Sequence, residues 1–162
     1  MKRRLLKSIQ FFTLAGLLLL GACNFWIAGH SNDFGMILSG EGVANPADGT
    51  TAFTMRADGV EGSCKGSSKP LEKGDGRRWA SIEISCTDGR TAKGESVLGG
   101  MEWGTGTGID SCGNEFETYF NIHQYYVTQK LEEFRRMAKN HSGGFDRCQA
   151  SGDAPPHRDP LS

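Results

Sequence analysis

Four Asp-Gly pairs divide the middle of the chain into short segments. They are Asp48-Gly49, Asp58-Gly59, Asp75-Gly76 and Asp88-Gly89. Asp-Gly favours tight hairpins, because the central positions of a type I′ turn need positive φ angles. The segment Trp79–Cys86, just before the last pair, alternates apolar and polar residues. Its apolar face is predicted to hold Ala80, Ile82, Ile84 and Cys86. A period of two is typical of a half-buried strand, so the pattern predicts antiparallel hairpins.

Further strand candidates surround this hairpin. A hairpin about Asp58-Gly59 is predicted, with Phe53 and Met55 facing inward and Val60 to Cys64 forming the returning arm. The other candidates are residues 36–43, 91–98 and 116–122, with Phe116 and Phe120 on one face and Tyr119 on the other. Glycine, at 23 of 162 residues, punctuates these segments instead of forming a low-complexity block. The spacing predicts a small antiparallel barrel or sandwich.

The C-terminal third changes its period. Val127, Leu131, Phe134 and Ala138 recur at steps of four, three and four, which predicts one helix over about 123–141 packed on an open face or end of the sheet. The predicted class is therefore mainly β with one C-terminal helix. Three prolines interrupt residues 150–162. We expect that stretch to be a disordered tail following a domain of residues 35–149.

The N-terminus has the layout of an export signal. Lys2, Arg3, Arg4 and Lys7 precede an apolar stretch over residues 9–20. The run Leu20-Gly21-Ala22-Cys23 then resembles the bacterial lipoprotein signal. The resemblance implies that residues 1–22 are removed and that Cys23 receives acyl chains such as palmitate. Residues 23–34 are then predicted to be a spacer between lipid and domain. An uncleaved anchor continuing to Ala28, or an ordinary cleaved signal, are the alternatives.

The resemblance also implies a location. A lipidated Cys23 places the chain in a bacterial cell envelope, and Asn24 after the cysteine favours the outer membrane over the inner one. Removing 22 of the 162 residues takes four of the 18 basic residues and none of the 19 acidic ones, so the remaining 140 residues carry a net charge of −5. This charge argues against a nucleic-acid partner and against electrostatic docking on anionic lipid. Attachment is expected through more than one acyl chain.

The number of cysteines fits the same interpretation. Five cysteines cannot all pair, but lipidation of Cys23 leaves four, for which three connectivities exist. In an exported domain we expect two disulfides, Cys64–Cys86 and Cys112–Cys148. The first joins neighbouring strands, and the second holds the segment after the helix against the sheet. The sequence has neither CxxC nor closely spaced histidines, so we expect no metal and no cofactor.

Two motifs that could suggest catalysis have simpler interpretations. Gly104 to Gly108 reads GxGxG instead of GxGxxG and precedes a predicted strand, which favours a loop or a twisted edge strand over a nucleotide site. Ser111-Cys112 with His123 could supply a nucleophile and a base, but an oxidising compartment favours a disulfide at Cys112. His30 falls in the predicted spacer.

Three functional hypotheses follow. The first is a non-enzymatic binding or structural module, with Trp79 and Trp103 available for a ligand-binding face. The second is an inhibitor or accessory subunit of a periplasmic enzyme or secretion machine. The third is a hydrolase that uses carboxylates among Asp110, Glu115 and Glu117, which would have to face each other across a cleft. We favour the first.

A second resemblance concerns the folded domain. The run Cys86 to Arg90, with Gly104 to Gly108 and Ile109-Asp110 after it, is similar to a small β module of uncharacterised proteobacterial envelope proteins. This similarity implies location and fold, and it assigns no activity.

Overall fold

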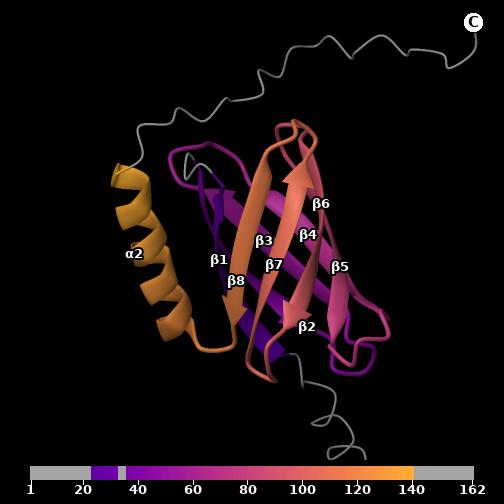
Figure 1. The fold of residues 1–162 in the computed structure, drawn as a ribbon. Coiled ribbons are helices and arrows are strands. Elements are labelled where there is room, and N and C mark those ends of the chain that lie inside the picture. The colour runs from indigo at the N-terminus through magenta and orange to yellow at the C-terminus, as the bar shows by residue number, and fades with distance from the viewer. Residues whose placement is uncertain (1–22, 33–35, 141–162) are drawn as a thin grey trace, which may run out of the picture.

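Eight antiparallel strands close into a barrel, and one helix packs against its outer wall (Figure 1). The computed structural model describes residues 23–32 and 36–140. The strands are β1 (Cys23–Ser31), β2 (Ile37–Ala44), β3 (Thr51–Ala57), β4 (Cys64–Leu71), β5 (Trp79–Cys86), β6 (Thr91–Leu98), β7 (Trp103–Asp110) and β8 (Glu115–Asn121), and the helix is α2 (Gln124–Asn140). Each strand pairs with the next, and β8 pairs with β1. The predicted fold class, in its barrel form, is confirmed.

The Asp-Gly pairs all lie in connections between consecutive strands. Their glycines have φ values of +70° to +85°, the left-handed region that glycine tolerates without strain. The predicted two-residue turns are nevertheless too short, since these connections span residues 45–50, 58–63, 72–78 and 87–90. For the same reason the returning arm after Asp58-Gly59 is Cys64–Leu71, and not Val60 to Cys64.

The predicted spacer at residues 23–34 is wrong for most of its length. Residues 23–31 form β1, which pairs with β2 from Cys23↔Ala44 onward and with β8 from Trp26↔Asn121 to Ser31↔Phe116. The folded domain thus begins at Cys23 and not at residue 35. The apolar run after Cys23 supplies the strand that closes the barrel, and its Phe25 and Ile27 side chains contribute to the core.

Glycines in the barrel wall make room for aromatic rings inside it. Gly42 and Gly66 flank Phe53 on neighbouring strands. A Cβ on either glycine would lie within 2.7 Å of that side chain. Gly104 and Gly108 have the same relation to Phe120 and Phe116 on β8. Paired glycine and phenylalanine positions let a small barrel curve tightly and still fill its interior.

The rest of the interior is aliphatic. Met55, Ile82 and Ile84 are buried with Ile27 and Phe116, and the predicted Cys64–Cys86 disulfide joins β4 to β5 at the edge of this cluster. The inward positions predicted on β3, β5 and β8 are confirmed, because strand alternation alone determines which face of the wall a residue occupies.

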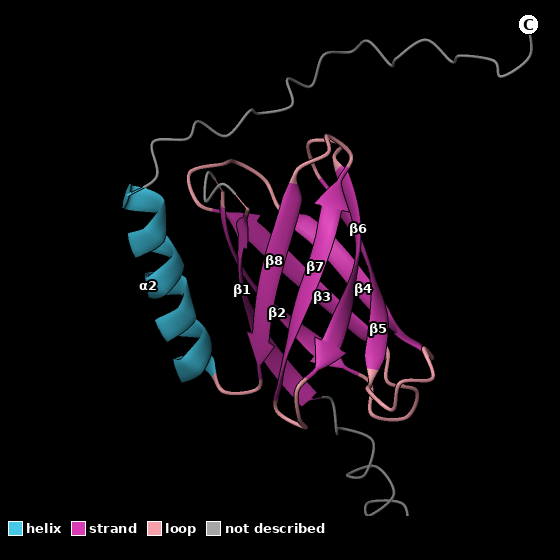
Figure 2. Cartoon of the chain, viewed as in Figure 1, coloured by secondary structure: helices cyan, strands magenta, loops and turns pink. Residues whose placement is uncertain are grey.

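Helix α2 covers part of the outer wall, over β1, β2 and β8 (Figure 2). Its apolar stripe, Val127, Leu131, Phe134 and Ala138, packs on Ala28, Ile37 and Tyr119. The predicted helix over 123–141 is confirmed, and it begins near the end of the barrel where β1 starts. We call that end the Cys23 end. Among the described residues, no helix is both long and apolar enough to cross a bilayer.

Candidate functional site

The barrel interior leaves almost no free space. The cavity near the disulfide, at the end opposite Cys23, has a volume of about 50 Å³ and is lined mainly by apolar side chains. Ligand pockets usually measure roughly 300–1,000 Å³, so this cavity can hold water but no organic ligand. This cavity is therefore too small to be a binding site for an organic ligand, whereas the outer wall carries a larger hollow.

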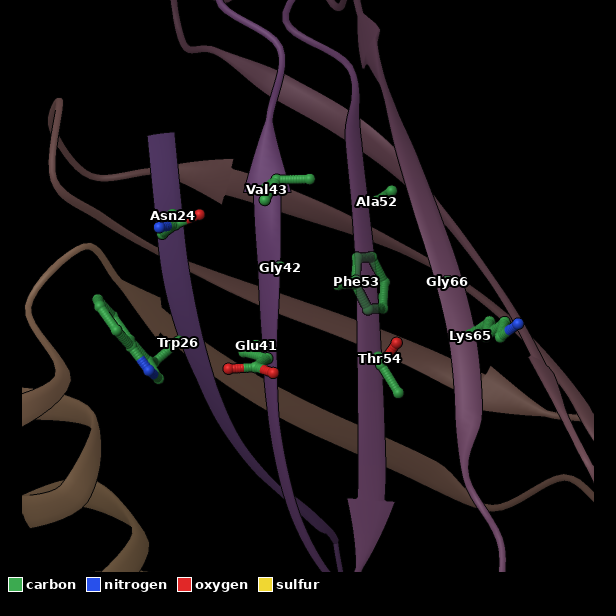
Figure 3. Close-up of a pocket in the computed structure, with 10 residues that line it drawn as sticks. All are labelled: Asn24, Trp26, Glu41, Gly42, Val43, Ala52, Phe53, Thr54, Lys65 and Gly66. Atoms are coloured by element: carbon green, nitrogen blue, oxygen red, sulfur yellow. The ribbon is translucent and has the colours of Figure 1, made fainter. Parts of the chain in front are cut away.

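A shallow hollow of about 520 Å³ lies on the outer wall of β1–β4 (Figure 3). Two rows of outward side chains line it, one across β1–β4 and one across β1–β3. Pairing places Trp26, Glu41, Thr54 and Lys65 side by side in one row, and Asn24, Val43 and Ala52 in the other. Between the rows lie Gly42, Phe53 and Gly66. The glycines have no side chain and Phe53 faces the interior, so the backbone of these residues forms the floor of the hollow.

The hollow combines an aromatic ring with unpaired charges. Trp26 is half-buried and packs at the edge of the helix layer, which fixes its position. Among the described residues, neither Glu41 nor Lys65 has an opposite charge within 4.0 Å. A ring, a carboxylate and an ammonium along one row can contact an extended polar ligand by stacking, hydrogen bonding and ion pairing. Sequence reasoning missed this site, because its first strand was assigned to the spacer.

Cys23 has an exposed side chain and a free thiol, and it is the first residue of β1. Cys112 is disulfide-bonded, but Cys148 lies outside the described residues, so the pairing Cys112–Cys148 stays a prediction. The predicted tail over 150–162 and the signal over 1–22 lie outside them as well.

The predicted carboxylates do not face one another across a cleft. Asp110 structures the β7–β8 turn, where its Oδ1 accepts bonds from the backbone N–H groups of Cys112 and Asn114, both at 2.9 Å. Glu115 accepts a hydrogen bond from the Asn32 side chain. Glu117 points to the outer wall, 3.9 Å from the Nε2 atom of His30. Asp110 and Glu115 both line the 50 Å³ cavity, which is too small for a sugar.

The proposed pair of Cys112 and His123 is also separated. Cys112 lies in the β7–β8 connection and His123 follows β8, so the two residues lie beyond opposite ends of that strand. His123 is exposed, with its Nε2 atom 3.7 Å from Glu102. His30 belongs to β1, not to a spacer, and it is buried under α2 with its ring 4.5 Å from that of Phe134.

Two other predicted features are now placed. Gly104 to Gly108 form part of β7, which is paired on both sides, so the segment is neither a loop nor an edge strand.

Trp79 donates an indole hydrogen bond to Asp75 at 2.9 Å, while the ring of Trp103 stacks on that of Tyr119, with 6.5 Å between the ring centroids. The two tryptophans lie on β5 and β7 and do not share the hollow with Trp26. No group of three metal-ligating side chains occurs within 23–32 and 36–140.

Comparison with known proteins finds similarity to solved β-barrels and none in sequence to a family model or a curated protein. Among solved structures, a de novo designed fluorescence-activating β-barrel shares 15% identity, with a TM-score of 0.49 over 60% of this chain and 89% of its own. A redesigned β-barrel bound to DFHBI shares 16% identity, with a TM-score of 0.47 over 60% of this chain and 91% of its own.

Proposed function

We propose that this chain is a lipid-anchored bacterial envelope protein and that its barrel is a non-enzymatic binding or structural module. The observation that carries the proposal is Cys23, which follows Leu20-Gly21-Ala22 and is exposed at the very start of the first strand. The Cys64–Cys86 disulfide gives independent support for export, because disulfides persist in oxidising compartments. The outer membrane stays the favoured location on the strength of Asn24.

The filled interior supports a role that uses the outer wall. The interior cavity near the disulfide measures only about 50 Å³, whereas the hollow bounded by Trp26, Glu41 and Lys65 measures about 520 Å³ and is open to a ligand. An open, shallow site with separated charges suits an extended polymer such as a peptide segment or a glycan chain. Catalysis is not part of the proposal, since Asp110, Glu115 and Glu117 do not line this hollow.

Intact-mass spectrometry tests the anchor. The protein is purified from its native membrane without reducing agent. The expected mass begins at Cys23, is increased by acyl groups and is reduced by four hydrogens for two disulfides. A Cys23→Ser variant is the matched control, and it should keep the leader and gain no acyl mass. A wild-type chain that begins at Met1 without acyl groups would contradict the proposal.

Site-specific photo-crosslinking tests the binding surface. A photo-reactive residue replaces Thr54 in the hollow or, as a matched control, Thr107 on the outer face of β7, which is exposed as well. We expect a discrete crosslinked product in cells from position 54 and none from position 107. Equal crosslinking from both positions would contradict a specific role of the hollow. A protein product would favour the accessory-subunit hypothesis, and a glycan product the binding of envelope polymer.

A further inference from the structure

Exposed apolar side chains gather at one end of the barrel. Nine large hydrophobic side chains are exposed among the described residues. Two of them, Val60 and Ile109, lie toward the end opposite Cys23. The other seven lie at the Cys23 end: Val43, Leu98, Met101, Trp103, Ile122, Tyr125 and Tyr126. Exposed apolar side chains that gather in one region mark an interaction site more often than scattered single residues do.

Five of these side chains form what we call the aromatic rim: Met101, Trp103, Ile122, Tyr125 and Tyr126. Met101 is 90% exposed, Tyr125 is 65% exposed and Trp103 is 43% exposed. The rim is one continuous structure, because the Ile122 N–H donates to the Glu102 carbonyl at 2.9 Å and so joins the β6–β7 turn to the start of α2. The rings of Tyr125 and Tyr126 lie 5.6 Å apart.

Strand pairing places Cys23 beside the aromatic rim. The last pair between β1 and β8 at this end is Trp26↔Asn121, and Asn121 also pairs with Trp103. Cys23 therefore extends three residues beyond the level of Trp103, a distance of roughly 10 Å. The chain leaving β8 runs in the same direction through Ile122 into α2 (Figure 1).

We propose that the aromatic rim enters the headgroup region of the lipid bilayer and orients the barrel on the membrane. This inference rests on the proposed acylation of Cys23. Because β1 pairs with β2 from Cys23 onward, no spacer separates the acyl chains from the barrel, and the Cys23 end is held at the membrane surface. Tryptophan and tyrosine favour that interface, and their apolar contact adds a second anchoring signal to the acyl chains.

Charge does not drive this contact. The connections at the Cys23 end, residues 45–50, 72–78, 99–102 and 122–123, carry four acidic and three basic residues. Anionic lipid gains nothing from such a surface, whereas apolar contact is independent of it. The contact is therefore expected to be equally strong on neutral and anionic vesicles. Added salt should not affect it, because salt screens only electrostatic interactions.

Quenching of tryptophan fluorescence by brominated lipid tests the proposal. The full acylated protein, verified by intact mass, is reconstituted into phosphatidylethanolamine and phosphatidylglycerol vesicles that contain phosphatidylcholine brominated near the headgroup end of its acyl chains. Comparison of wild type with Trp103→Phe isolates the signal of Trp103 from those of Trp26 and Trp79. The matched control adds Val60→Trp to Trp103→Phe, which moves one exposed tryptophan to the opposite end while keeping three in total.

The expected result is that Trp103 is quenched, that Trp103→Phe loses this quenched component, and that the tryptophan at position 60 is unquenched. An acylated protein in which Trp103 is not quenched overturns the membrane orientation and leaves the lipid anchor standing. Equal quenching at positions 103 and 60 also overturns the membrane orientation. Protection of Trp103 from aqueous iodide without quenching by brominated lipid overturns it too, and would indicate a protein partner. A chain without acyl groups overturns both proposals.

Discussion

The two apolar layers of this protein are built in opposite ways. Inside the barrel, space is created by missing side chains, because glycines stand opposite phenylalanine rings on neighbouring strands. Between α2 and the outer wall, ordinary side chains meet, and Val127 and Phe134 pack on Ala28 and Ile37. The inner layer is confined by a closed wall, whereas the helix of the outer layer can shift. The same substitution should therefore cost more in the first layer than in the second.

Truncation of a buried ring tests this difference most strongly. Phe116→Ala should lower the free energy of unfolding by about 3–5 kcal/mol, because the closed wall cannot collapse into the space left by the ring. Phe134→Ala in the helix layer is the matched comparison, and it should cost less because α2 can move toward the wall. Urea unfolding without reducing agent measures both. Equal losses would show that the two layers relax alike.

Removal of the Cys64–Cys86 bridge should have the next largest effect. The bridge spans 22 residues, for which loop-closure entropy predicts a stabilisation of about 3 kcal/mol. Replacing both cysteines by alanine should lower the urea midpoint while leaving the helix layer intact, as reported by amide exchange in α2. Exchange in α2 that rises before global unfolding would show that the bridge also supports the outer layer.

Glycine substitutions should distinguish contacts with a side chain, which can be relieved by a second substitution, from contacts with the backbone, which cannot. The three atoms nearest to an added Cβ at Gly66 belong to the Phe53 ring, the closest at 2.2 Å, whereas at Gly94 the Cβ would meet the Thr107 carbonyl oxygen at 2.2 Å and the Gly108 Cα at 2.8 Å. Each alanine should cost about 1–3 kcal/mol. Adding Phe53→Leu should relieve Gly66→Ala, and it should leave Gly94→Ala unchanged. Additive costs at Gly66 and Phe53 would contradict the pairing.

These contrasts explain which features the sequence predicts. The helix stripe and the strand alternation over Trp79–Cys86 follow a period set by side chains that are present. The role of Gly104 to Gly108 depends on the phenylalanines of β8, which no local pattern reveals. The hollow on β1–β4 was missed for a related reason. Residues 23–31 carry no turn signal before them, and they follow a signal-like segment, so nothing local separates a strand from a spacer.

The polar contact that ties the outer layer to the barrel should have a smaller effect. Arg135 of α2 donates to Asp58 in the β3–β4 connection at 2.8 Å and also contacts Glu132. Both carboxylates raise the pKa of Arg135 above its usual range. The side chains are partly exposed, so Arg135→Gln should cost no more than about 1 kcal/mol. Exchange should increase in α2, while Lys130→Gln, whose ion pair lies within the helix, should leave it unchanged.

Acid should release the surface contact between Trp79 and Asp75. The indole hydrogen bond from Trp79 lowers the pKa of Asp75 from its ordinary value of 3.8. A lowered carboxyl pKa contributes stability that is present above pH 3.8 and is lost as the pH falls through the lower folded-state pKa. The Trp79 indole N–H resonance should therefore shift below pH 3.8, and Asp75→Asn should abolish the shift. A shift that persists in Asp75→Asn would point to another group.

The seam between β1 and β8, which is the strand pairing that closes the barrel, should form after the hairpins during folding. Its pairs, from Ser31↔Phe116 to Trp26↔Asn121, join residues separated by 85 to 95 positions. Hairpins along the meander can form as each turn appears, but this seam has to wait until the last strand is present. Contacts of such long range slow folding, because the chain loses loop entropy before it gains the contact. A nascent chain that lacks β8 therefore stays an open sheet with two unpaired edges, and the barrel closes in a single late step.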